Sequence, residues 1–124
     1  MKKLSLVALL GFLLTGCSTT LTNLTPAQQP RNANNLYPVE VAWDSSQRTI
    51  VKNTVRGYVI VGPDIYPMQR TPIVKDRWET LIPVPPDQNS VHYKFKFEYD
   101  VREIPQRRAG SDATPEYRLQ VTDR

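Results

Sequence analysis

The chain has 124 residues, with 16 basic and 12 acidic side chains, one histidine and one cysteine. Without Lys2 and Lys3 at its start, the chain has 14 basic against 12 acidic residues, and this net charge of +2 is too small to indicate a nucleic-acid partner. One cysteine excludes an intramolecular disulfide. Eleven prolines against five glycines disfavour long helices and favour strands joined by rigid turns, in a chain long enough for one domain.

The start of the chain has the pattern of a secretory signal. Lys2 and Lys3 are basic, residues 4–14 are almost wholly apolar, and two small residues then precede Cys17. An apolar run of roughly 7 to 15 residues is typical of a cleaved signal peptide, whereas about 20 are needed to span a bilayer. The pattern predicts a signal peptide over residues 1–16.

The end of this signal resembles the lipobox of bacterial lipoproteins, in the residues Leu14, Thr15, Gly16 and Cys17. The resemblance implies cleavage after Gly16, diacylglycerol on the Cys17 thiol and acylation of the new amino terminus. Three acyl chains, at about 0.8 kcal/mol per buried CH₂ group, would hold the protein at a membrane permanently. Ser18 implies sorting to the outer membrane, because the inner-membrane retention signal is usually an aspartate at that position. The alternative is an ordinary secretory signal with an incidental cysteine.

The next segment is polar, and Leu21 and Leu24 are its only large apolar side chains. Such a composition buries too little apolar surface to offset the entropy lost on ordering. We therefore predict that residues 17–35 form the lipidated cysteine and a flexible tether, and that the folded domain covers residues 36–124. The alternative is that part of the tether pairs with the domain as a first strand.

The domain alternates between apolar and polar positions with a period of two, which is the pattern of β-strands. The clearest run is residues 91–101, in which every odd position is aromatic or β-branched and every even position is polar. A helix would scatter these aromatic side chains around its circumference. Strands are predicted over residues 37–43, 54–61, 65–70, 77–84, 91–101 and 116–122.

The connections follow from turn-forming residues. Gly62-Pro63-Asp64 predicts a hairpin between the second and third of these strands, and Pro67 makes the returning limb an edge strand because it has no amide donor. Residues 48–53 fit either a short strand or an extended crossing. Residues 102–115 are predicted to be a long polar connection.

Six or seven short strands without a helix predict an all-β fold, an immunoglobulin-like antiparallel β-sandwich, with a small barrel as the alternative. The side chains expected to face the core are Val39, Val41, Trp43, Val55, Val59, Val61, Trp78, Ile82, Tyr93, Phe95, Phe97, Leu119 and Val121.

No set of residues has the pattern of an active site. His92 is the only histidine, it falls on the polar face of its strand, and no serine is linked to it by spacing. A zinc site needs three or four His, Cys or carboxylate ligands, which this chain does not supply. Its dispersed aspartates fit hydrogen bonds to turn backbones better than calcium ligation; they are Asp44, Asp64, Asp87 and Asp112. The prediction is a non-catalytic protein without a cofactor.

The run from Met68 to Phe97 resembles immunoglobulin-like modules that bind starch and glycogen. The residues that carry this resemblance are Arg77-Trp78-Glu79, Ile82-Pro83-Val84-Pro85 and Tyr93-Lys94-Phe95-Lys96-Phe97. The resemblance implies that sugar rings stack on exposed aromatic side chains. Because Trp43 and Trp78 are predicted to face the core, Tyr58 and Tyr66 are the candidate platforms.

A second candidate surface is basic. Arg102, Arg107 and Arg108 flank the connection before the last strand, and Glu103 offsets them only in part. These arginines are candidates for attracting phosphate-bearing lipid or anionic glycan, although salt screens exposed charges beyond about 8 Å. The alternative is a solvated loop.

These observations together predict a membrane-anchored, non-catalytic interaction or structural module of the cell envelope, with an envelope protein as partner and no nucleic acid. The alternative function is a glycan-binding module.

Overall fold

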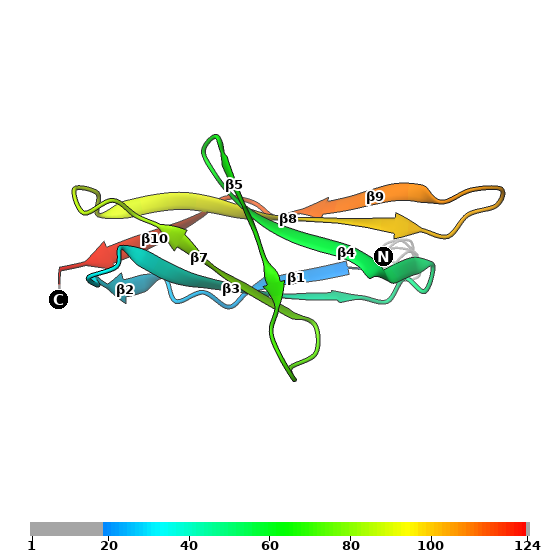
Figure 1. The fold of residues 1–124 in the computed structure, drawn as a ribbon, viewed down its shortest axis with the longest axis horizontal. Coiled ribbons are helices and arrows are strands. Elements are labelled where there is room, and N and C mark those ends of the chain that lie inside the picture. The colour runs from blue at the N-terminus through cyan, green and yellow to red at the C-terminus, as the bar shows by residue number, and fades with distance from the viewer. Residues whose placement is uncertain (1–18, 124) are drawn as a thin grey trace, which may run out of the picture.

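Residues 19–123, which the computed structural model describes, form ten strands and no helix (Figure 1). None of the described residues therefore belongs to a helix long and apolar enough to cross a membrane. The strands are β1 (Thr19–Asn23), β2 (Gln28–Pro30), β3 (Leu36–Ser45), β4 (Ile50–Val61), β5 (Asp64–Pro67), β6 (Gln69–Arg70), β7 (Arg77–Pro83), β8 (Ser90–Val101), β9 (Arg108–Ala113) and β10 (Tyr117–Thr122).

The strands form two sheets packed face to face. One sheet has the order β1-β3-β7-β6, and the other has the order β2-β10-β8-β4-β5, with β9 also paired to β8. Neighbouring strands are antiparallel except β2 and β10, which run parallel. The predicted all-β immunoglobulin-like sandwich is therefore confirmed, and the barrel alternative is not the architecture.

Alternating side chains fill the space between the sheets, as the sequence predicts. Trp43 of β3 stacks on Phe97 of β8 with ring centroids 5.8 Å apart, and Trp78 of β7 meets the same ring edge-on at 5.5 Å. All the predicted core side chains are buried except Val61, which is partly buried at the end of β4. The core also includes side chains that the predicted set omits, which are Tyr37, Ile50, Val51, Met68, Val84, Tyr99 and Val101.

The predicted hairpin after residue 54 is present, but its returning limb divides between the sheets. β5 pairs with β4, whereas β6 pairs with β7 in the other sheet. The chain crosses at Met68, which is buried and donates its amide hydrogen to the carbonyl of Gly57 at 2.8 Å. Residues 50–53, which the sequence left ambiguous, belong to β4 and precede an irregularity in its pairing with β8.

The prediction of a flexible tether is wrong for the described part of residues 17–35. β1 pairs with the end of β3, in a register that sets Thr19 opposite Ser45, and β2 pairs with β10. Between them, Thr25 exchanges hydrogen bonds with the backbone of Glu40. Polar composition misled the prediction because edge strands gain backbone hydrogen bonds without an apolar face of their own. The folded domain thus includes residue 19, while Cys17 and the predicted signal peptide lie outside the described residues.

The long polar connection predicted over residues 102–115 is also wrong in part. Residues 108–113 form β9, which pairs with the second half of β8. Most β9 side chains are small or polar, so the segment has no apolar alternation to reveal it. Gly110 lies directly against the Tyr99 ring, where any side chain would collide.

Strand directions place a distinct set of turns at each end of the molecule (Figure 1). The start of β1, the β3–β4 turn and the β8–β9 hairpin tip lie at one end, which we call the β1 end. The β7–β8 turn and the end of β10 lie at the other end, and the β4–β5 turn projects from the side of the molecule. The β6–β7 loop projects sideways from the long axis.

Candidate functional site

The clearest concave site among the described residues is a cleft of about 400 Å³ between the β3–β4 turn, the start of β4 and the β6–β7 loop. Both tryptophans of the chain, Trp43 and Trp78, line it, together with the aliphatic side chains of Ile50 and Val55. We call it the tryptophan cleft. Its volume is within the range of small-ligand sites, which is roughly 300 to 1,000 Å³.

The wall of the cleft is the β6–β7 loop, residues 71–76, whose backbone is held in an unusual conformation. Ile73 and Asp76 both have positive φ, at 72° and 61°. Asp76 accepts a hydrogen bond from the Trp43 amide at 2.8 Å, which fixes the loop to β3. A β-branched residue at positive φ is strained, and the side chain of Ile73 is fully exposed.

Positive charge surrounds the cleft. Arg70 places its guanidinium carbon 4.8 Å from the centre of the Trp78 ring and donates to the Lys52 carbonyl at 2.7 Å. Lys52, Lys75 and Arg77 add three more cations. The lining carboxylates are Asp44 and Asp76, so the lining carries four cations against two anions.

One lining hydroxyl has an unused hydrogen-bonding capacity. The Oγ1 atom of Thr71 is buried and has no hydrogen-bond partner among the described residues. A buried hydroxyl without a partner is costly, so a partner supplied from outside would be favourable at this position.

A carboxylate behind the cleft ties the second sheet to Trp43. Asp112 of β9 accepts a hydrogen bond from the Trp43 indole at 3.4 Å. Burial raises the pKa of Tyr99, and a hydrogen bond to Asp112 raises it further, so this tyrosine stays protonated at neutral pH. The sequence placed Asp112 in a turn, whereas it lies in a strand and contacts the core.

His92 occupies the position that the sequence predicts, on the exposed face of β8. Its Nδ1 atom lies 3.9 Å from the Glu116 carboxylate, and both side chains are well exposed. No group of three metal-binding side chains occurs among residues 19–123. Nothing in the geometry of these residues brings a nucleophile and a base together.

The two candidate sugar platforms do not share a surface. Tyr66 lies opposite Val59 in the β4–β5 ladder and packs against the core, whereas Tyr58 is on the other face of the sheet and is half-buried. The indoles of Trp43 and Trp78 show only 7% and 5% of their surface. The described residues therefore present no pair of exposed aromatic rings for one sugar chain.

The three candidate arginines do gather, at the tip of the β8–β9 hairpin. Arg108 pairs with Glu103 at 2.8 Å, and Arg107 lies 3.7 Å from the Asp100 carboxylate. Arg102 is exposed, and its backbone amide donates to the Thr49 carbonyl at 2.7 Å. Two of the three charges are thus partly neutralised by neighbours within the hairpin.

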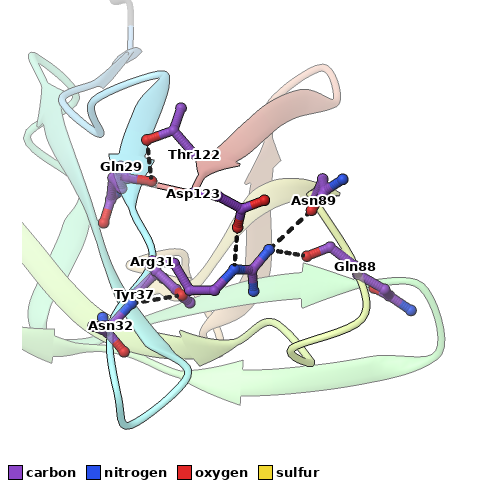
Figure 2. Close-up of polar contacts among 8 residues, drawn as sticks. All are labelled: Gln29, Arg31, Asn32, Tyr37, Gln88, Asn89, Thr122 and Asp123. Atoms are coloured by element: carbon purple, nitrogen blue, oxygen red, sulfur yellow. Dashed lines mark hydrogen bonds and ion pairs between the residues drawn. The ribbon is translucent and has the colours of Figure 1, made fainter.

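A second polar cluster, at the end opposite β1, was not predicted from the sequence because it lies in the supposed tether (Figure 2). Arg31 donates to Asp123 at 2.7 Å, to the Gln88 carbonyl at 2.8 Å and to the Asn89 side chain at 2.9 Å. Its backbone amide donates to Thr122 at 2.8 Å. The Asp123 hydrogen bond raises the pKa of Arg31, so the cluster stays charged. It joins the beginning of the domain to its end, which is a structural role.

No family model matches the chain, and no curated protein matches it in sequence. Among solved structures, the chain is similar to AggA, the major subunit of aggregative adherence fimbriae type I from Escherichia coli. The TM-score is 0.47 and the identity 9%, over 87% of this chain and 97% of that one. It is also similar to murine CRIg, with a TM-score of 0.45 and 14% identity over 86% of this chain and 99% of that one. Likenesses this distant assign no function to the chain.

Proposed function

We propose that the chain is a lipid-anchored, non-catalytic binding module of the bacterial cell envelope. The observation that carries this proposal is the lipobox of residues 14–17, which stands immediately before a folded domain. β1 begins at Thr19, two positions after Cys17. A lipid on Cys17 would therefore hold the sandwich against the outer membrane with almost no intervening chain.

The tryptophan cleft is the proposed binding site, and its chemistry favours an acidic protein segment. Ile73 and Val74 present aliphatic surface on the loop that forms its wall, and four cations surround its mouth. An acidic segment with apolar side chains matches both features. A sugar would need exposed ring faces, which the buried indoles do not offer, so the glycan-binding alternative is weaker.

The anchor is tested with Cys17→Ser in the full chain. The parent protein should remain with outer membranes through salt and carbonate washing, and mass spectrometry should find three acyl chains on residue 17. The serine variant lacks the thiol that receives diacylglycerol, so it should appear in the soluble fraction or retain its signal peptide. Ser18→Ala is the matched control and should stay with the membrane. An unmodified Cys17 in the parent would refute the proposed anchor.

The protein-binding role is tested by photocrosslinking in intact envelopes. A photoreactive amino acid at Val74, beside the cleft, should yield one discrete adduct with another envelope protein. Charge reversal by Lys75→Glu with Arg77→Glu should reduce that adduct severalfold, because it removes the complementarity to an acidic partner. The control probe at Ile65, an exposed position in β5 that does not line the cleft, should yield none.

The glycan alternative makes the opposite prediction. Under that alternative, starch, glycogen or peptidoglycan fragments retard the protein in gels, and Tyr58→Ala abolishes the retardation. Retardation of this kind without a Val74 adduct would replace the protein-binding role by glycan binding.

A further inference from the structure

The β1 end of the sandwich faces the membrane if the proposed lipidation is correct. Thr19 is paired with Ser45 at this end, and Cys17 precedes Thr19 by two residues. Two residues of fully extended chain span at most about 7 Å. If Cys17 carries the lipid, the attachment point is therefore no more than about 7 Å of chain from Thr19, which is paired beside the β3–β4 turn.

The β8–β9 hairpin extends farther toward that side than the start of β1. Val101, the last residue of β8, is paired with both Ile50 and Arg108, and the tip between Val101 and Arg108 continues past them. Figure 1 shows this tip at the extreme of the long axis, beyond the first residues of β1. A domain held by Cys17 with this end toward the bilayer brings the hairpin tip to the lipid headgroups.

The composition of the tip suits that location. Ile104 is 99% exposed, so a large aliphatic side chain stands in solvent at the tip. Pro105 follows it and has no amide hydrogen, so this position has no backbone donor to lose its hydrogen bond when water is excluded. Arg102 and Arg107 lie on either side, at the spacing that lets cations reach lipid phosphates while an aliphatic side chain enters the interface.

We propose that the tip of the β8–β9 hairpin, residues 102–107, is a membrane-contact element. Ile104 enters the headgroup region, and the arginines exchange their carboxylate partners for lipid phosphate. The exposed pairs of Arg107 with Asp100 and of Arg108 with Glu103 are weak in water, so this exchange costs little. The contact is weak on its own, but the lipid anchor makes it intramolecular and raises its effective concentration greatly.

The test uses the absence of any cysteine other than Cys17, whose thiol the lipid occupies in the proposed protein. Ile104→Cys then supplies one free thiol for a nitrobenzoxadiazole fluorophore in the full lipidated chain. The protein is reconstituted in vesicles of zwitterionic phospholipid with phosphatidylglycerol. The label at 104 should shift its emission to shorter wavelength and lose most of its quenching by aqueous iodide. Labelled Ile65→Cys, an exposed position in β5 away from the hairpin tip, should stay fully open to quenching by iodide.

Three results decide the proposal. Protection at 104 but not at 65, reduced by Arg102→Glu with Arg107→Glu, supports it. Equal quenching of the labels at 104 and 65 overturns it. Protection of a label at Ile73→Cys without protection at 104 also overturns it, because the β6–β7 loop would then be the part that contacts the membrane. Vesicle flotation of the parent protein tests the lipidation separately from the hairpin contact. Failure to float refutes the lipidation, whereas flotation with a label at position 104 that iodide still quenches refutes only the hairpin contact.

Discussion

Replacing Phe97 by alanine should lower the free energy of unfolding by about 3 to 5 kcal/mol, the cost typical of removing a buried aromatic ring. Phe97 has no exposed surface, and its ring lies between Trp43 and Trp78 from the opposite sheet. No other ring among the described residues is in contact with both tryptophans. Since a domain of this size has a total stability of about 5 to 15 kcal/mol, the variant should lose a large share of its stability.

Urea titration followed by tryptophan fluorescence measures this change, because both reporters contact the deleted ring. Ile104→Ala is the control, since its side chain is almost fully exposed and its loss should change stability by no more than about 0.5 kcal/mol. A Phe97→Ala midpoint equal to that of the parent would mean that the two sheets do not pack through this ring.

The second large effect is expected from Gly57→Ala. Gly57 lies beside Phe97 in the β4–β8 ladder, and an added Cβ would meet the Phe97 Cε1 atom at 2.7 Å. The ring also contacts Trp43 and Trp78, which limit how far it can move aside. We therefore expect a loss of about 1 to 3 kcal/mol, the usual cost of overpacking a core.

A double substitution separates this clash from an effect on the backbone. Gly57→Ala should cost much less in a Phe97→Leu background, because the smaller side chain leaves room for the methyl group. Gly62→Ala is the control: it also replaces a glycine, but nothing lies within 4 Å of the added Cβ, so its cost should not depend on residue 97. Additive effects of the Gly57 and Phe97 changes in urea titrations would contradict the proposed contact.

Period-two alternation predicted the strands that bury one face in the core and expose the other to solvent. The run of residues 91–101 corresponds closely to β8, and residues 37–43 lie within β3. In both strands the side chains that the pattern assigned to the core are buried, apart from Val91, which is partly buried. Burial of alternate side chains leaves a direct record in the sequence, so these elements are recognisable without a structure.

Edge strands leave no such record. Thr19 to Asn23 and Arg108 to Ala113 join the sheets through backbone hydrogen bonds, and their side chains are mostly polar or small. A composition rule assigns both to loops because it counts buried apolar surface and not main-chain pairing. The sequence also could not predict that the chain changes sheets at Met68, where β5 pairs with β4 and β6 pairs with β7, since this change depends on which sheet lies nearest.

The tryptophan cleft was only partly predictable. Trp43 and Trp78 were correctly assigned to inward faces, and that assignment explains why their rings are poor sugar platforms. The cation over Trp78 comes from Arg70, which reaches it only because β6 has crossed to the β7 sheet. Such a contact depends on the topology, and neither spacing nor composition records it.

The parallel pairing of β2 with β10, together with the ion pair between Arg31 and Asp123, has a consequence for biogenesis. A nascent chain that leaves the ribosome or an export channel amino terminus first exposes β2 long before β10 exists to receive it. The sandwich can close only when residues 117–122, which form β10, have emerged. A chain truncated before β10 would leave β2 with an unpaired edge, so quality-control proteases should discriminate sharply between chains that contain β10 and chains that lack it.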